Sequence, residues 1–391
     1  MARRQKVTLL EKDAPDSASN GSAGLSKDPV GPFCMVVPKG DEKHVLPSHR
    51  SFCIAMLNSG NVVRCEGDSP AEFMGIIADS KIAWINFTLS DVEGEAPGIA
   101  ASLGFNPKMV SEILFDYSKK YEDFDTELGL RLPAVTVNKL EVNVSPLVIL
   151  LRKGVILTMH GGEVIRLVRF SRYAHTFMRK IDYNAPWQDI LTSVLVRIID
   201  ENNDRNFDHL REIQEEGDEL SKSLMDPETP RARLGEDIYK MKHALITHLN
   251  SLWYTLDVIN SLRYGDAEVI TDDKNQLNRI TMLANDVTNQ ISLSEHMSEV
   301  LASGLEVLQS IYNNQLQVLN NQLAFAAAWL AVIGTAVLVP NTLATIFGIG
   351  PIAEHFSWQS ITAILLLSSI LSGAFMYWFI RKRGWFPKRA F

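Results

Sequence analysis

The fold is decided by residues 323–380, which read LAFAAAWLAVIGTAVLVPNTLATIF (323–347), GIGPIAEHFS (348–357) and WQSITAILLLSSILSGAFMYWFI (358–380). Glu354 is the only Asp, Glu, Lys or Arg in this stretch. At about 1.5 Å per residue, each long run is sufficient to cross a hydrocarbon core of about 30 Å. Two such runs in tandem predict a hairpin of two transmembrane helices rather than buried helices of a soluble protein.

The charges that flank this hairpin predict its orientation. Arg381, Lys382 and Arg383 follow the second run, and the connecting loop contains neither Lys nor Arg. Positive charge accumulates on the cytoplasmic side of membrane proteins. We therefore expect an extracytoplasmic loop at 348–357, a basic cytoplasmic tail at 381–391, and both chain ends on the cytoplasmic side of the cytoplasmic (inner) membrane.

Averaged over the whole chain, the hairpin included, the composition is that of a soluble protein. The 391-residue chain is 46% apolar and 21% charged, with a formal net charge of −8. An acidic chain without a basic face argues against nucleic acid as a partner. The sequence has no nucleophile elbow, phosphate-binding loop or His-Glu-x-x-His pattern. We expect neither an enzyme nor a covalently bound cofactor.

A long helix is predicted to enter the first apolar run. Residues 272–322 contain no proline and a single glycine, Gly304, and apolar residues recur there at spacings of three and four. Continued to Phe347, this helix would be on the order of 110 Å long. Its apolar stripe needs neighbouring helices. Several copies around an axis and a membrane-tethered coiled coil both satisfy that need.

Within the first run, small and hydroxyl-bearing residues follow one stripe. Such a stripe suits either tight helix packing or the lining of a narrow pore. Pro340 removes a backbone donor at mid-membrane, and Asn341 is a polar side chain at the same depth. The candidate pore-lining residues are Ala328, Val332, Thr335, Val339, Asn341, Thr342 and Thr345.

An amide-rich segment, residues 313–322, precedes the first run. Amides at a pore mouth can hold the water shell of an ion, whereas on a plain anchor they form a solvated helix end. The candidate residues of a cytoplasmic pore entrance are Asn314, Gln317 and Asn321.

The remainder of the chain divides into three parts. Residues 1–32 are predicted to be a mobile tail, because they are rich in Ser, Gly, Asp and Ala. Residues 33–185 combine strand patterns with short helices, which predicts an α/β domain. Residues 186–322 are predicted to be a helical domain and stalk helix. It should contain one helix over 187–224 and another over 234–264.

Acidic residues crowd the first of these helices. Most such runs are solvated helix surfaces, and the alternative is a site for a hard divalent cation. The candidate ligands are Glu201, Asp204, Asp208 and Glu212. Histidines at 209, 243, 248 and 296 do not have the i, i+4 zinc spacing, and we interpret them as ordinary polar residues of helices.

These residues resemble the CorA and ZntB superfamily of two-span divalent-cation transporters. The resemblance includes Pro340 with Thr342, the outer sequence Ile346-Phe347-Gly348, and the closing Arg381-Lys382-Arg383-Gly384-Trp385. Further toward the amino terminus, residues 82–87 resemble the family's Trp-Ile-Asp strand. Residues 103–105, followed by 113–114, resemble its Leu-Gly-Ile helix. Residues 148–160 resemble its hairpin ending in Thr-Val-His.

The resemblance implies an α+β cytoplasmic domain, long stalk helices and two carboxyl-terminal transmembrane helices, assembled as a CorA-like funnel and homopentamer. It also implies divalent cations as substrates and as cytoplasmic regulators. One feature departs from the family. Its Gly-Met-Asn signature, whose amide ring catches a hydrated cation, reads Gly348-Ile349-Gly350 here. The candidate outer mouth and selectivity residues are then Gly348, Ile349, Gly350 and Glu354, the last giving a ring of five carboxylates.

Three functions follow from the sequence. The first is a channel or transporter for a divalent metal cation, with Mg²⁺ as the expected ion, gated by cytoplasmic cation binding. The second is a zinc-type transporter that is coupled to protons. The third, motivated by the missing asparagine, is a non-conducting membrane scaffold or cation sensor.

Overall fold

The computed structural model describes residues 33–36, 51–116, 119–225, 230–264, 267–350 and 356–383. The predicted mobile tail, Glu354 and the basic residues beyond Arg383 lie outside these ranges. The strands are β1 (Phe33–Val36), β2 (Phe52–Leu57), β3 (Val62–Glu66), β4 (Ser80–Leu89), β5 (Tyr121–Asp123), β6 (Glu127–Asn138), β7 (Glu141–Arg152) and β8 (Val155–Gly161). The helices are α1 (Pro70–Ala78), α2 (Val92–Ser102), α3 (Pro107–Phe115), α4 (Ile165–Met178), α5 (Trp187–Asn203), α6 (Asn206–Met225), α7 (Arg231–Tyr264), α8 (Lys274–Phe347) and α10 (Trp358–Lys382).

The strands form one mixed sheet. Its order is β1-β3-β2-β4-β8-β7-β6-β5, and all neighbours are antiparallel except β4 and β8. Trp84 lies opposite Ile156 in that parallel pair. The turn between β6 and β7 has Lys139 at φ 57°, and the turn after β7 has Gly154 at φ 76°. These two hairpins place β6, β7 and β8 side by side, in the same sheet as β4.

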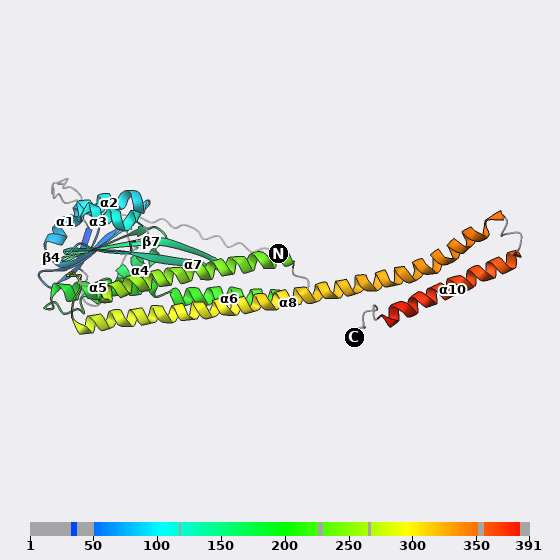
Figure 1. The fold of residues 1–391 in the computed structure, drawn as a ribbon. Helices are drawn as coiled ribbons and strands as arrows, with labels where there is room; N and C mark the ends of the chain where they lie inside the picture. The colour runs from blue at the N-terminus through cyan, green and yellow to red at the C-terminus, as the bar shows by residue number, and fades with distance from the viewer. Residues whose placement is uncertain are drawn as a thin grey trace, which may run out of the picture.

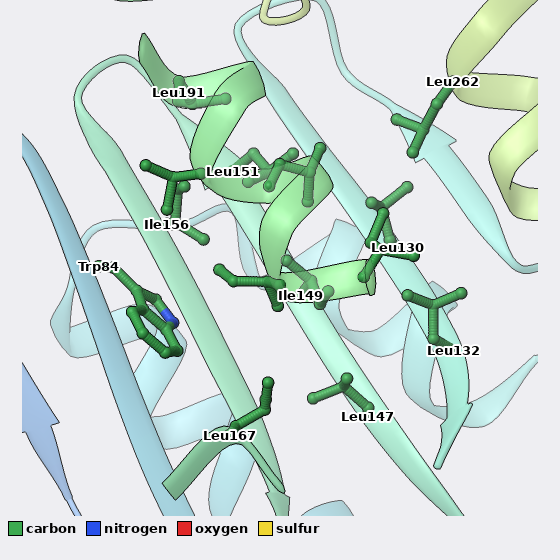
Figure 2. Packing of buried hydrophobic residues seen from close by; sticks show 14 of the residues in the cluster. Trp84, Leu130, Leu132, Leu147, Ile149, Leu151, Ile156, Leu167, Leu191 and Leu262 are labelled. Carbon is green, nitrogen blue, oxygen red and sulfur yellow. The ribbon is translucent and has the colours of Figure 1, made fainter. Parts of the chain in front are cut away.

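Both faces of the sheet are covered by apolar side chains. Figure 2 shows the face that carries Trp84, Ile149 and Leu151, against which Leu191 of α5 and Leu262 of α7 pack. The indole of Trp84 donates to Thr158 at 3.0 Å, so its polar atom is satisfied inside the core. The other face packs against α1, α2 and α3. The sheet therefore lies between two helical layers.

The helical part begins differently from the sequence prediction. Instead of one helix over 187–224, α5 ends at Asn203 and α6 begins at Asn206. Both flanks of this break are buried polar residues rather than the continuation of a single apolar stripe, and Asn206 donates across the break to Asn203 at 3.3 Å. Strand β2 and helices α1 and α4 were also not predicted. The strand pattern of residues 82–87 agrees with β4, and residues 113–114, which resemble part of a family helix, lie in α3.

The long helix is continuous, as predicted. α8 runs for 74 residues without interruption from an Asp273 cap, whose carboxylate accepts from the backbone N–H groups of Asn275 and Gln276. In Figure 1, α6 and α7 lie beside the first part of α8, which then leaves the domain as a rod and is joined only by α10. α8 and α10 each contain a stretch long and apolar enough to cross a membrane.

Candidate functional site

The contact between α8 and α10 is formed by small side chains. Pro340 has no N–H, so the carbonyl of Ala336 one turn earlier loses its helical partner. The hydroxyl of Ser369 on α10 donates to that carbonyl at 2.8 Å. A Cβ added to Gly373 would lie 3.3 Å from Cβ of Ala336, so the two backbones approach closely. The hairpin is thus joined at the point where the proline opens the α8 ladder.

Aromatic pairs occupy the two ends of this contact. The ring centroids of Trp329 and Tyr377 are 6.4 Å apart, and those of Phe347 and Phe356 are 5.5 Å apart. Between them, Ser372 donates to the carbonyl of Thr335 at 3.3 Å. One side of α8 is therefore used along its apolar length by α10.

The candidate pore-lining residues divide into two groups. Ala328, Val332 and Thr335 are half-buried, and the other four are exposed in the single chain. The four exposed residues are Val339, Asn341, Thr342 and Thr345. The structure thus brings the stripe to the edge of the α10 contact and, from Val339 onward, onto the face that α10 leaves uncovered.

The threonine hydroxyls of this stripe have a common geometry. Thr335 donates to the carbonyl of Ala331 at 2.8 Å, and Thr342 and Thr345 donate to the carbonyls four residues earlier at 2.9 Å. Because each hydroxyl proton is directed to the helix backbone, the lone pairs of each oxygen remain for an outside partner. This face therefore presents oxygen acceptors.

At the outer end, α8 stops at Phe347 and Gly348 follows as its cap. The N–H of Gly348 donates to the carbonyl of Ala344 at 2.9 Å, and that of Ile349 donates to the carbonyl of Ile346 at 3.2 Å. Gly348, Ile349 and Gly350 are exposed. Glu354, the fourth predicted residue of the mouth, lies outside the described residues.

The predicted inner entrance is on the same helix. Asn314, Gln317 and Asn321 are exposed on α8, and their spacing of three and four places them along one face. They precede the apolar stretch, as the sequence indicates.

The four acidic candidates have separate surroundings in one chain. Glu201 is buried, pairs with Arg197, and accepts from the hydroxyl of Tyr173 at 2.7 Å. Burial, followed by this bond to Glu201, raises the pKa of Tyr173 to about 12. Asp204 is exposed at the break between α5 and α6.

The other two acids contact different partners. Asp208 lies 3.2 Å from Arg211 in an exposed ion pair, and Glu212 accepts from the backbone N–H of Lys139 at 2.7 Å. Within the ranges that the structure describes, no three His, Cys, Asp or Glu side chains gather closely enough to hold a metal ion.

The family model described as "CorA-like Mg2+ transporter protein" matches residues 79–382, which include β4, the helical bundle and both apolar helices. The chain belongs to the CorA-like family of divalent-cation transporters. A comparison with curated proteins found no match.

Two solved structures share the fold of this chain. The chain is similar to the complete CorA magnesium transporter of Methanocaldococcus jannaschii, with a TM-score of 0.63 and 17% identity over 86% of this chain and 99% of that one. The soluble domain of the same transporter gives a TM-score of 0.51 and 17% identity over 68% and 98% of the two chains. The cytoplasmic domain of ZntB from Vibrio parahaemolyticus gives 0.45 and 17% over 60% and 89%.

The α10 side of this CorA-like hairpin is not among the residues predicted from the sequence. Ser369, Ser372 and Gly373 make the close contacts with α8. Their signal was present in the second apolar run, where small residues stand three and four positions apart, the spacing of closely packed membrane helices.

Proposed function

We propose that this chain forms a homopentameric pathway for divalent cations, with Mg²⁺ as the principal substrate, in the cytoplasmic membrane. The main observation in support of this proposal is the one-sided contact between α8 and α10. α10 covers one side of α8 and leaves the hydroxyls of Thr342 and Thr345 exposed. Two helices cannot enclose an aqueous path, so copies arranged around an axis would place this uncovered face toward the centre.

The chemistry of that face suits a hydrated cation. Hydroxyl oxygens whose protons are held by the helix backbone present lone pairs to the water shell of Mg²⁺, an ion that loses its water reluctantly. The amide of Asn341 adds a polar group at the same level. Val339 and Val332 supply apolar rings that restrict the path when the pore is dry.

The two ends of the path follow from the same arrangement. Cations enter at Gly348, Ile349 and Gly350, where backbone carbonyls replace the asparagine amide of the resembling transporters, with Glu354 as an added ring of charge. They leave past Asn321, Gln317 and Asn314. Both chain ends are then cytoplasmic, and Arg381, Lys382 and Arg383 lie at the inner surface.

Regulation is proposed to come from the domain that α8 leaves. Divalent cation held by Glu201, Asp204, Asp208 or Glu212 against a neighbouring copy would favour the closed arrangement of the α8 helices. The proposed division of the chain remains a tail at 1–32, an α/β domain at 33–185, a helical domain at 186–322, and the membrane hairpin thereafter.

Ion flux into liposomes that contain the purified protein tests this function. We expect uptake of Mg²⁺ above that of protein-free liposomes, measured beside Zn²⁺, Co²⁺ and Ni²⁺. Preferred Zn²⁺ uptake that rises with a pH gradient would instead support the zinc-type transporter.

A non-conducting scaffold or cation sensor is the second candidate, because Gly350 stands where the resembling transporters have their asparagine. No flux of any of the four ions, with a pentamer that still binds divalent cation, would support it.

A further inference from the structure

A layer of buried polar residues crosses the helical bundle where α5 gives way to α6. All of its members are buried except the guanidinium group, which is half-buried. The polar layer comprises Arg166 of α4, Asn203 of α5, Asn206 and His209 of α6, His248 of α7, and Gln290 and Ser294 of α8.

The polar layer separates two apolar cores. On α7 and on α8, the residue before the layer and the residue after it belong to different hydrophobic clusters. The successions are Leu245, His248 and Leu252 on α7, and Ile291, Ser294 and Met297 on α8. The same change occurs on the third side of the bundle, between Ile199 and Leu210. Apolar packing is therefore interrupted at one level on α7, on α8 and between α5 and α6.

Some polar groups of the layer satisfy one another. The amide of Asn206 donates to Gln290 at 3.2 Å and to Asn203 at 3.3 Å. Arg166 lies 3.0 Å from Nε2 of His209, and because a guanidinium only donates, that nitrogen accepts. The proton of His209 is then on Nδ1.

Other polar groups of the layer have no hydrogen-bond partner in the part of the chain that the structure describes. They are both ring nitrogens of His248, Nδ1 of His209, Oγ of Ser294 and Nδ2 of Asn203. His248 and Ser294 are fully buried. A buried polar atom left without a partner costs about 1–3 kcal/mol, so a cluster of them requires a polar occupant.

The donor set selects water over a metal ion. His209 uses its one lone pair toward Arg166, whose positive charge also opposes a cation. His248 alone would be left as a nitrogen ligand. Both donors and acceptors are unpartnered here, and buried water supplies both to groups of this kind.

The helical structure is interrupted at the same level. α5 ends at Asn203 and α6 begins at Asn206, while α7 and α8 run past the layer unbroken. Helices bend where their hydrogen-bond ladder is interrupted or where a water enters it. We propose that the polar layer is a hydrated joint, in which enclosed water binds the unpartnered groups and about which α6 and the adjoining length of α8 move relative to the sheet.

Hydrogen exchange of the full-length protein, read by mass spectrometry, tests the motion. Amides of residues 200–212 should exchange about ten-fold faster than those of residues 190–198, because local opening concentrates where apolar packing is weakest. His248→Leu should remove most of this difference. His243→Leu, an exposed histidine on the same helix, is the matched control and should leave it unchanged.

Thermal unfolding tests whether water, rather than another protein group, binds these side chains. His248→Leu and Ser294→Ala should leave the unfolding midpoint unchanged or raise it by about 2–4 °C, whereas Leu245→Ala, in the neighbouring apolar cluster, should lower it. Equal exchange rates for residues 190–198 and residues 200–212 would show that the polar layer is not a joint. The unfolding midpoints of His248→Leu and Ser294→Ala could instead both fall as low as that of Leu245→Ala. That result would show that enclosed water does not bind these groups. Both expected results are required, and neither depends on which ion is transported.

Discussion

The hydroxyl of Ser369 lies 2.8 Å from the carbonyl oxygen of Ala336, the group that Pro340 deprives of its helical donor. This relationship explains how α8 remains one helix through a proline inside its apolar length. Backbone groups freed in a membrane helix must find another partner, since lipid supplies none. Here the second helix of the hairpin supplies it.

Ser369→Ala should therefore weaken the hairpin by about 1 kcal/mol, because it leaves the Ala336 carbonyl unpaired in a dry setting. The measurement is the free energy of unfolding in detergent micelles. Ser368→Ala is the matched control, since that hydroxyl donates to Leu365 of its own helix at 2.8 Å. Pro340→Ala restores the backbone N–H that donates to the Ala336 carbonyl. In that variant, Ser369→Ala should lower the free energy of unfolding much less. An equal cost on both backgrounds would show that the bond to Ala336 is not the cause.

Gly373→Leu should lower the unfolding midpoint by several degrees, because even a Cβ at this position lies 3.3 Å from Cβ of Ala336. The contrasting variant is Gly334→Leu on α8, where an added Cβ meets no atom within 4 Å. That change should leave the single-chain hairpin intact and reduce ion flux, because Gly334 stands near the uncovered face. If Gly334→Leu unfolds the hairpin while Gly373→Leu does not, the assignment of the two faces of α8 is wrong.

Acid should destabilise the helical bundle through two buried histidines. Burial, with the charge of Arg166 as the next cause, lowers the pKa of His209 from 6.5 to about 3 and that of His248 to about 4. The charges around His209 are Arg166 on α4 and Arg205 and Asp208 on α6, while the buried α8 side chains of the layer, Gln290 and Ser294, are neutral.

The folded state keeps both rings neutral, and the unfolded chain binds their protons below pH 6.5. Stability is thus fully present above pH 6.5 and is lost as the pH falls from 6.5 toward 4, by about 1.4 kcal/mol per pH unit for each ring. Unfolding free energies measured between pH 7 and pH 4 should show this slope. The slope for His248→Leu should be smaller by the contribution of one histidine. A variant slope equal to that of the unmodified protein would contradict the assignment.

Gly350→Asn should raise Mg²⁺ uptake, because a ring of amides at the outer mouth holds the water shell of a cation that backbone carbonyls alone hold less well. Flux assays in liposomes measure the effect, and Gly350→Ala controls for the loss of glycine. A gain specific to asparagine indicates an intact pore with an altered mouth. Loss of flux in the asparagine variant alone would contradict a shared outer site.

The sequence predicted those features that depend on periodicity. The continuous helix through residues 274–347 could be read from the absence of proline before Pro340 and from apolar spacing, and strands such as β4 from β-branched alternation. The break at 204–205 could not, because Asn203, Asn206 and His209 read as a solvated helix surface until α7 and α8 bury them.

The partner of a proline-freed carbonyl also depends on tertiary structure. Nothing local to Pro340 indicates that Ser369 of another helix satisfies Ala336. The acidic candidates show the same limit in another form, since Glu212 stands in an acid-rich run yet accepts from the backbone N–H of Lys139, which is distant in sequence.

The central claim is that the uncovered face of α8 lines the ion path. The most direct test is Mg²⁺ flux into liposomes carrying Thr342→Cys, before and after a charged, water-soluble thiol reagent, beside Leu343→Cys, a half-buried neighbour on α8. The reagent should block flux through the Thr342→Cys protein and spare flux through the Leu343→Cys protein. Flux that persists through a fully labelled Thr342→Cys protein, or no Mg²⁺ flux through the unmodified chain, would contradict it.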